Sequence, residues 1–190
     1  MTRLILASSS PRRREILKLL PATFEVLTSR TDESVDDTLP PEEIVMTLAC
    51  KKAGAVAEHE KDAFVIGADT IVVYENHILG KPGNEEKAAE MLRLLSGKTH
   101  TVYTGVCVVH NNKSEKFCEK THVTFWDLSE EEIEAYIRTG EPMDKAGAYG
   151  IQGFGATLVK SIEGDYFSVV GLPVAKLYRT MKEMGYPFNL

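Results

Sequence analysis

The fold of this chain is decided by the stretch Phe64-Val65-Ile66-Gly67-Ala68-Asp69-Thr70-Ile71-Val72-Val73. Its two apolar runs, residues 64–66 and 71–73, are typical of central strands and predict a strand pair within residues 62–74. Asp69 lies between the runs, and a carboxylate in such a place is costly to bury unless it is paired, hydrogen-bonded or bound to metal. The stretch therefore predicts both the centre of a sheet and a functional carboxylate.

Outward from this stretch, strand and helix signals alternate along the chain. Strands are expected at residues 3–7, 24–28, 100–110, 116–127 and 158–162, and helices at 10–20, 41–58, 84–95, 129–138 and 173–184. Asn111-Asn112 predicts the turn of a long hairpin, and Ser129 with Glu132 predicts a capping box. No linker-like or repeated stretch interrupts the pattern. We expect an α/β fold with a mixed, twisted sheet flanked by helices, in a single domain over residues 1–190.

Composition excludes several classes of protein. The 190 residues include 22 Lys+Arg and 28 Asp+Glu, a net charge of −6, and 43% are hydrophobic. This is the composition of a globular protein, and the charge argues against a nucleic-acid polymer as ligand. The apolar runs are far shorter than the ~20 residues of a membrane span and too short for a secretory signal, so no membrane partner and a cytoplasmic location are expected. Three widely spaced cysteines fit reduced thiols, and the five histidines lack metal-ligand spacing, so we expect them to be structural or exposed.

The basic residues are distributed unevenly, with four more basic than acidic residues among the first 30. Ser8-Ser9-Ser10-Pro11-Arg12-Arg13 lies where a strand ends and a helix begins, a place that favours an anion such as phosphate. The alternative is a serine cap followed by a solvated basic face. Successive helical residues point about 100° apart, so the three arginines cannot all serve one ligand. Arg12 and Arg13 are the candidates, and Arg14 is expected to be exposed.

Two lysines and an acidic loop add further candidates. Lys52 falls within the apolar arc of its helix and needs a partner, which is equally a structural carboxylate or a ligand. Lys81 lies in the turn Gly80-Lys81-Pro82, a composition that is weak evidence alone. Asp32 and Glu33 follow the second strand, where they could bind metal or form part of a solvated loop.

A glycine-rich segment, residues 144–153, contains Gln152. Glycine lets backbone approach a flat ligand closely, and a glutamine amide can both donate to and accept from a base edge. No Gly-Lys-Ser or Gly-Lys-Thr closes the segment, so it is not a phosphate-binding P-loop. Its composition alone indicates a constrained loop.

Six motifs in this order resemble the Maf family over about residues 4–180. They are Ser-x-Ser-Pro-Arg-Arg at 8–13, Gly-Ala-Asp-Thr at 67–70, Gly-Lys-Pro at 80–82, Leu-Ser-Gly-Lys-x-His at 95–100, Asp-Lys-Ala-Gly-Ala-Tyr-Gly-Ile-Gln-Gly at 144–153 and Gly-Asp-Tyr at 164–166. The resemblance implies a nucleoside triphosphate pyrophosphatase with a fold similar to the inosine triphosphatase class. It also implies a cytoplasmic homodimer, and an association with septum formation whose cell-division partner is unknown.

Carried over by position, the resemblance assigns roles to individual residues. Asp69 would be the catalytic acid/base, with Glu33 as a second metal ligand and Mg²⁺ or Mn²⁺ as the cation. The remaining residues would bind phosphates (Ser8, Arg13, Lys52, Lys81) or set base preference (Arg12, Thr70, Gln152), in a combination that looks like the branch acting on dTTP and UTP. The implied reaction is metal-assisted attack of water at the α-phosphorus, which releases pyrophosphate.

Two rival functions remain at this point. The first is a pyrophosphatase whose physiological targets are modified pyrimidine nucleotides. The second is a division-regulating protein that senses nucleotide and acts by binding another protein. The combination of Asp69, Lys52 and Lys81 favours catalysis, because a sensor does not need an acid/base beside the phosphates.

Overall fold

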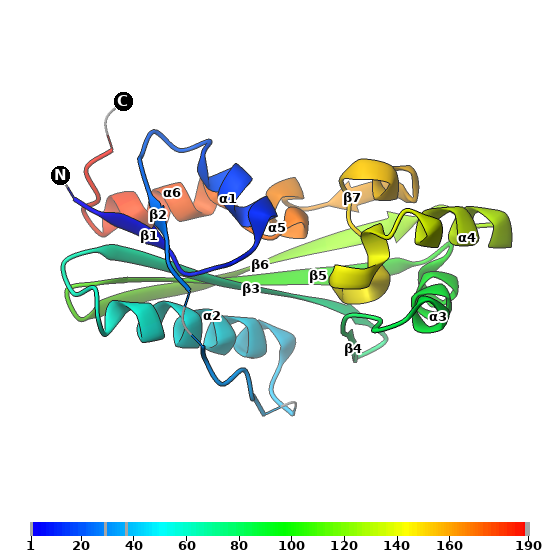
Figure 1. Ribbon diagram of the computed structural model, residues 1–190, viewed down its shortest axis with the longest axis horizontal. Helices are drawn as coiled ribbons and strands as arrows, with labels where there is room; N and C mark the ends of the chain where they lie inside the picture. Colours follow the sequence, from blue (N-terminus) through cyan, green and yellow to red (C-terminus); the bar gives the residue numbers. More distant parts are fainter. Residues whose placement is uncertain (1, 29, 37, 189–190) are drawn as a thin grey trace. The chain divides into compact units, whose positions relative to one another are not determined.

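The structure is a computed structural model that describes residues 2–28, 30–36 and 38–188. Its elements follow one another in the alternating order that the sequence predicts (Figure 1), namely β1 (Leu4–Leu6), α1 (Pro11–Leu17), β2 (Glu25–Val26), α2 (Pro41–Ala57), β3 (Phe64–Tyr74), β4 (His77–Leu79), α3 (Glu85–Leu95), β5 (Thr99–His110), β6 (Lys113–Phe125), α4 (Glu130–Arg138), η1 (Glu141–Asp144), η2 (Ala146–Ala148), η3 (Gly153–Thr157), β7 (Val159–Glu163), α5 (Tyr166–Val170) and α6 (Val174–Glu183). Short 3-10 helices are labelled η.

The strands form one seven-stranded mixed sheet. Its order is β2-β1-β3-β5-β6-β7, and β4 pairs with β3 away from this path. Strand β1 is parallel to both β2 and β3, whereas the β3–β4 and β6–β7 pairs are antiparallel. The predicted α/β class with a mixed sheet is confirmed.

The chain divides into two compact units, and three strands contribute residues to both. Unit 1 comprises residues 1–69, 104–119 and 171–190, and unit 2 comprises 70–103 and 120–170. Strand β3 passes from unit 1 into unit 2 after Asp69, and β5 and β6 are shared in the same way. The prediction that all 190 residues form one domain stays a prediction.

Unit 1 packs helices on both faces of its strands. Figure 1 shows α2 on one face and α6 on the other. Side chains of β1, α2, β3 and β5 form its buried apolar cluster, which includes Ile5, Ala49, Ala53, Val65 and Cys107. Helix α2 therefore has its buried side against β3 and β5, where the candidate residues Lys52 and Asp69 also lie.

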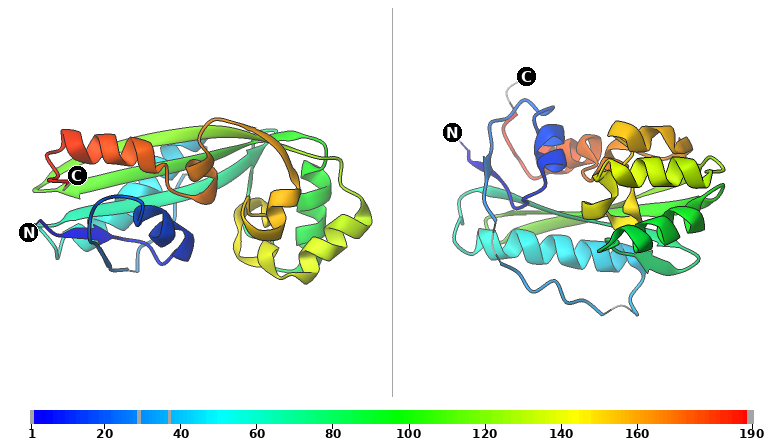
Figure 2. Two further views of the ribbon diagram at one scale, coloured as in Figure 1. Left: turned by 90° about the horizontal axis from the view of Figure 1, so that it is seen from above. Right: turned by 45° about the vertical axis from the view of Figure 1, so that its right-hand side comes forward.

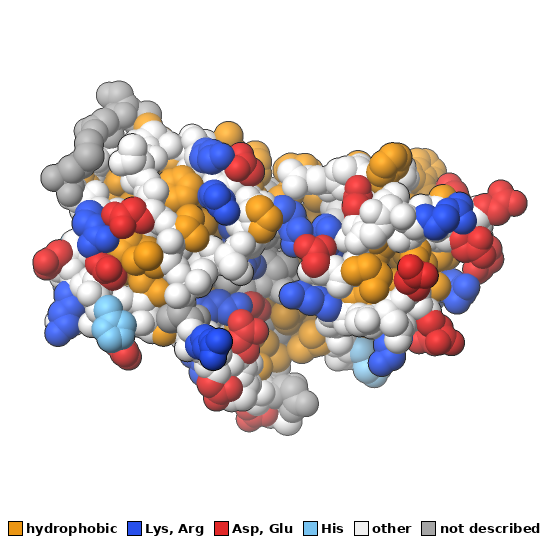
Figure 3. All heavy atoms as spheres, viewed as in Figure 1, with side chains coloured by type: hydrophobic (Ala, Val, Ile, Leu, Met, Phe, Trp, Pro, Cys, Tyr) orange, Lys and Arg blue, Asp and Glu red, His pale blue; other side chains and the backbone are white. Residues whose placement is uncertain are grey.

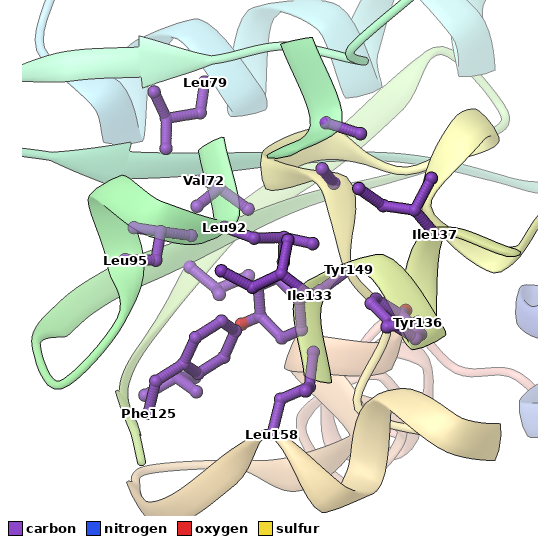
Figure 4. Close-up of a cluster of buried hydrophobic side chains, with 14 residues drawn as sticks. Val72, Leu79, Leu92, Leu95, Phe125, Ile133, Tyr136, Ile137, Tyr149 and Leu158 are labelled. Carbon is purple, nitrogen blue, oxygen red and sulfur yellow. The ribbon is translucent and has the colours of Figure 1, made fainter. Parts of the chain in front are cut away.

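Unit 2 has an apolar cluster of its own (Figure 4). Helices α3 and α4 lie side by side in Figure 2 and contact each other. Between them and the strands lie Leu92, Phe125, Ile133, Tyr136 and Tyr149, together with further buried side chains. The glycine-rich segment contributes Ala148 and Tyr149 to this cluster, which anchors it to the unit.

Most of the element signals hold, with one correction. The prediction of two strands within residues 62–74 is wrong, because β3 runs without a break from Phe64 to Tyr74. Gly67-Ala68-Asp69-Thr70 keeps an extended backbone and so joins the two apolar runs. The turn is formed next, by Glu75 and Asn76 with positive φ, and returns the chain as the unpredicted strand β4.

Local capping and turn signals are confirmed in detail. Ser10 caps α1 by accepting from the Arg13 N–H, although the helix ends at Leu17 rather than near Leu20. Ser129 and Glu132 form the capping box of α4. Asn111 and Asn112 take positive φ between β5 and β6, as a tight hairpin turn requires. Helix α5 was not predicted, and it begins after Asp165, whose carboxylate accepts from the Ser168 N–H at 2.6 Å.

Charged side chains of both signs are interspersed on the face drawn in Figure 3. This agrees with the near-balance of 22 basic and 28 acidic residues. Among the described helices, none is both long and apolar enough to span a bilayer.

Candidate functional site

The N-terminal candidates in unit 1 lie at the junction of β1 and α1. Ser8 follows the strand, is 8% exposed, and accepts a hydrogen bond from the Ser10 N–H at 3.2 Å. Ser10 in turn caps α1, so two serine hydroxyls organise the turn before Pro11. The predicted strand-to-helix junction is confirmed, and it places Arg12 and Arg13 in the first turn of the helix.

Arg13 is held by its planar guanidinium group. Its Nε donates to the Gly171 carbonyl at 2.7 Å, and its Nη1 donates to Ser8 Oγ at 3.4 Å. Burial lowers the pKa of Arg13, while the nearby Asp69 and Glu33 carboxylates oppose this shift. Arg13 is therefore a fixed cation within electrostatic range of both candidate carboxylates. Arg14 is exposed, as expected.

Asp69 and Lys52 form the centre of the unit 1 candidates. Lys52 Nζ lies 2.6 Å from Asp69 Oδ1 and 3.1 Å from Glu33 Oε1. The Lys52 and Asp69 side chains are 18% and 15% exposed, whereas Glu33 is 65% exposed on its loop. Both expectations for partly buried charges hold, because Lys52 and Asp69 each have an opposite charge as partner. The adjacent Lys51 is exposed and instead donates to the Ser34 carbonyl.

Two glycines allow α2 to approach the sheet closely enough for this pair. A Cβ on Gly67 in β3 would lie 2.2 Å from the Ala49 carbonyl oxygen and 2.7 Å from the Ala53 nitrogen. A Cβ on Gly105 in β5 would lie 2.4 Å from the Val45 carbonyl. Only glycine fits where helix backbone and strand backbone are this close. Lys52 adjoins Ala53 in α2, so this packing sets the distance between Lys52 and Asp69.

The donor set of Asp69 and Glu33 fits a hard divalent cation. Among the described residues no group of three or more His, Cys, Asp or Glu side chains gathers as a metal cage. Mg²⁺ is commonly bound by one or two carboxylates together with substrate phosphates, so two converging carboxylates suit it. Lys52 lies between them, and its ammonium group balances part of their charge.

In unit 2, Lys81 and Gln152 belong to two connected loops. Lys81 is exposed in the turn after β4, and Gly80 in the same turn accepts a hydrogen bond from the Gly147 N–H at 3.1 Å. Gly147 has φ +70, and a Cβ there would lie 3.0 Å from Val72. Gln152 is exposed and immediately precedes η3. Thr70 is half-buried in β3, directly after Asp69.

Some motif residues turn out to have structural roles. His100 is 2% exposed, and its Nε2 lies 2.6 Å from the Tyr149 hydroxyl. Ser96 accepts from the Leu128 N–H at 2.7 Å. The prediction that the histidines are structural or exposed holds for His100. This residue ends the motif at residues 95–100 and is buried. Sequence reasoning missed the Gly171 carbonyl that orients Arg13, because a backbone acceptor has no side-chain signal.

One protein family matches nearly the whole chain. The family described as Maf-like protein matches residues 3–184. The chain belongs to the Maf-like protein family. This Maf-like chain is 56% identical over 185 residues to a dTTP/UTP pyrophosphatase of Bacillus cereus strain AH187, an alignment that covers 97% of each chain.

A second relative of the Maf-like chain has the same printed name. It is a dTTP/UTP pyrophosphatase of Bacillus thuringiensis subsp. konkukian strain 97-27, 56% identical over 185 residues and 97% of each chain. A solved structure of a Vibrio cholerae protein aligns with a TM-score of 0.37 and 14% identity, over 74% of this chain and 72% of that chain. A likeness this low carries no argument about the Maf-like chain.

Proposed function

We propose that this protein hydrolyses dTTP and UTP to the nucleoside monophosphate and pyrophosphate. The chain is an enzyme, a nucleoside triphosphate pyrophosphatase, and two relatives that are 56% identical over 97% of their length bear the name dTTP/UTP pyrophosphatase. One observation carries the proposal, namely the partly buried Asp69 carboxylate 2.6 Å from Lys52, within electrostatic range of Arg13. Such a set combines a proton acceptor with cations suited to phosphate.

In the proposed reaction Asp69 orients a water molecule and accepts its proton. The water oxygen forms a bond to the α-phosphorus, and the bond from that phosphorus to the bridging oxygen of the leaving group breaks. Pyrophosphate leaves with the electron pair of that bond. Lys52, Arg13 and Lys81 stabilise the negative charge that shifts toward the leaving group, an electrostatic contribution that is commonly the largest in phosphoryl transfer.

Asp69 and Glu33 would hold a divalent cation, Mg²⁺ or Mn²⁺. When bound, such a cation neutralises phosphate charge next to the two carboxylates. Ser8 accepts a hydrogen bond from Arg13 and would bind phosphate beside it. Lys52 contacts both carboxylates, so its ammonium group would add positive charge next to the site where they would hold the cation.

Base preference is assigned to Arg12, Thr70 and Gln152. An amide such as that of Gln152 has both a donor and an acceptor, which suits the edge of a pyrimidine. A threonine hydroxyl adds a second group that can donate or accept. The homodimer, the cytoplasmic location and any part in septum formation stay predictions.

A panel of nucleoside triphosphates with Mg²⁺ and product identification tests the proposal. We expect monophosphate plus pyrophosphate from dTTP and UTP, slower turnover of purine nucleotides, and near-complete loss of activity in Asp69→Asn. Asp62→Asn is the matched control, because Asp62 is exposed and precedes the same strand.

Other products or preferences would change the proposal. Diphosphate plus phosphate would exclude cleavage at the α-phosphorus, and a preference for purines would contradict the roles of Thr70 and Gln152. Higher kcat/KM for a modified pyrimidine triphosphate would identify that nucleotide as the better substrate. Tight nucleotide binding without turnover would instead favour the sensing function.

A further inference from the structure

Gln152 lies at the tip of a loop whose two arms meet in unit 2. A Cβ on Gly155 would lie only 1.8 Å from the Gly150 carbonyl oxygen, so the backbones on either side of Gln152 are in close contact. Ile151 is buried while Gln152 is exposed, and Gln152 makes no side-chain capping bond to η3 within the described chain. The loop thus exposes the Gln152 side chain between two backbone segments that are in close contact.

The arm that follows Gln152 is held by the carboxylate of Glu141. Glu141 Oε1 accepts from the Phe154 N–H at 3.0 Å, and Oε2 accepts from the Gly155 N–H at 3.2 Å. Gly153 has φ +63, and a Cβ there would lie 2.5 Å from Glu141 Oε1, so glycine leaves room for the carboxylate. Both carboxylate oxygens are engaged, in hydrogen bonds of the charge-assisted kind.

The arm that precedes Gln152 is held by the hydroxyl of Tyr136. The Gly150 N–H donates to Tyr136 Oη at 3.1 Å, and the ring of Tyr136 is buried in the cluster of Figure 4. Burial raises the pKa of Tyr136 to about 12, the Gly150 N–H opposes this shift, and the negative charge of Glu141 adds to it. Tyr136 therefore holds the arm before Gln152, and Glu141 holds the arm after it.

Glu141 is itself fixed at its backbone. Its N–H donates to Thr139 Oγ1 at 3.1 Å, and its carbonyl accepts from Lys145 Nζ at 2.6 Å. The backbone of Glu141 is thus held at the start of η1, a short distance after α4, which limits where its carboxylate can lie. Because the loop contains three glycines, it would otherwise sample many backbone conformations.

We propose that Glu141 is a positioning residue for Gln152, acting with Tyr136 to hold the loop so that the Gln152 amide is aimed in one direction. The inference rests on the proposed function, in which Gln152 contacts the base. Discrimination between bases by hydrogen bonds depends on fixed geometry, so loosening the loop lowers selectivity more than it lowers turnover.

The test measures kcat/KM for dTTP and for a purine triphosphate, GTP, with the full chain and Mg²⁺. We expect Glu141→Ala to lower the dTTP/GTP ratio by about 10-fold, because two backbone N–H groups lose their acceptor. Glu141→Gln keeps an acceptor oxygen and should stay within about 3-fold of the original ratio. Glu134→Ala is the matched control, since Glu134 is an exposed glutamate of α4 that pairs only loosely with Arg138, at 3.9 Å.

Tyr136→Phe keeps the buried ring and removes only the hydroxyl. It therefore tests the same clamp, by which we mean the hold of Tyr136 and Glu141 on the loop, if Glu141→Ala does not fold. We expect it to lower the ratio as well. A purely structural role for either residue would reduce the melting temperature and both kcat/KM values together, and leave the ratio unchanged. An unchanged ratio in both Glu141→Ala and Tyr136→Phe would overturn the inference.

Gln152→Ala separates this inference from the proposed function. If Gln152→Ala lowers the ratio and the clamp variants do not, the function stands and the clamp is wrong. If Gln152→Ala leaves the ratio unchanged, the base contact is wrong and the clamp fails with it. Support requires that Glu141→Ala adds little further loss in the Gln152→Ala background, as coupled residues do.

Discussion

Lys51 and Lys52 are neighbours in sequence with different surroundings. Lys52 is 18% exposed and contacts Asp69 and Glu33, whereas Lys51 is exposed and donates to the Ser34 carbonyl. The difference arises because successive helical residues point about 100° apart, which turns Lys52 toward the sheet. Two identical side chains on one helix therefore separate the effect of position from the effect of charge.

Lys52→Ala should lower kcat/KM for dTTP by about 100-fold, the usual scale for losing one cation or donor that stabilises developing charge. Lys51→Ala removes the same charge from the same helix and should change kcat/KM by less than about 2-fold. Steady-state kinetics on both variants checks the prediction. Equal effects would mean that net charge, rather than the contact with Asp69, controls the reaction.

The stability of unit 2 should depend on pH through the protonation of His100. It is 2% exposed, its Nε2 bonds the Tyr149 hydroxyl, and its Nδ1 has no partner among the described residues. Burial lowers the pKa of His100 from 6.5 to about 4. Because the folded state resists protonation, stability is complete above the unfolded value near 6.5 and falls as the pH drops from there to about 4, with no further loss from this residue below that.

Urea unfolding at about pH 7 and about pH 4.5 checks this linkage. His100→Gln retains a polar group for Tyr149 but does not titrate, so the wild type should lose about 2 kcal/mol more than the variant between these pH values. The comparison uses the change with pH, so a lower stability of the variant at neutral pH does not affect it. Identical losses in the two proteins would show that His100 becomes protonated without cost.

At the scale of elements, the spacing between α2 and β3 determines the distance between Lys52 and Asp69. A Cβ added to Gly67 would lie 2.2 Å from the Ala49 carbonyl oxygen. A Cβ added to Gly54, on α2 itself, would have nothing within 4 Å. The same substitution thus tests a tight contact and an open position. Strand and helix must separate to accommodate a methyl group at Gly67, which moves Lys52 relative to Asp69.

Gly67→Ala should destabilise the protein by about 1–3 kcal/mol through overpacking and should also lower kcat/KM for dTTP. Gly54→Ala should stabilise it by about 0.4–1 kcal/mol, since alanine is the better helix residue. Thermal or urea unfolding together with kinetics gives both quantities. A stable, fully active Gly67→Ala would show that helix and sheet adjust without disturbing the lysine.

At the scale of the whole molecule, two compact units share three continuous strands. Strand β3 contributes Val65 to the apolar cluster of unit 1 and Val72 to that of unit 2. Strand β5 contributes Cys107 and Val102 in the same manner. Melting one unit would unpair strands that continue into the other, so the units should unfold together.

Two local probes test this cooperativity in increasing urea. Trp126, the only tryptophan, reports unit 2 by fluorescence. With Cys50 and Cys118 replaced by serine, the buried Cys107 reports unit 1 by its reaction with a thiol reagent. We expect one common midpoint, as two-state unfolding requires. Two separate midpoints would show that each unit is stable alone and would contradict the single-domain prediction.

Signals that lie within a few consecutive residues were predictable from the sequence. The Ser10 cap, the Ser129–Glu132 box, the Asn111-Asn112 turn and the helical periods each depend on neighbours along the chain. The α/β class and the need of Asp69 and Lys52 for partners followed from apolar patterns around a charge. Where two outcomes had similar local signals, as within residues 62–74, the pattern could not distinguish one long strand from two.

Tertiary structure decided which distant groups meet. Lys52 and Asp69 are brought to 2.6 Å because Gly67 and Gly105 allow two backbones to approach, and no single segment encodes that distance. Arg13 is oriented by a carbonyl 158 residues away, and Glu141 holds a loop through backbone N–H groups. The sequence by itself thus determined most of the longer helices and strands and the chemistry of the candidate side chains, but not β4, α5 or the continuity of β3. Their partners depended on the folded backbone, because every residue except proline offers the same main-chain donor and acceptor, and only packing selects among them.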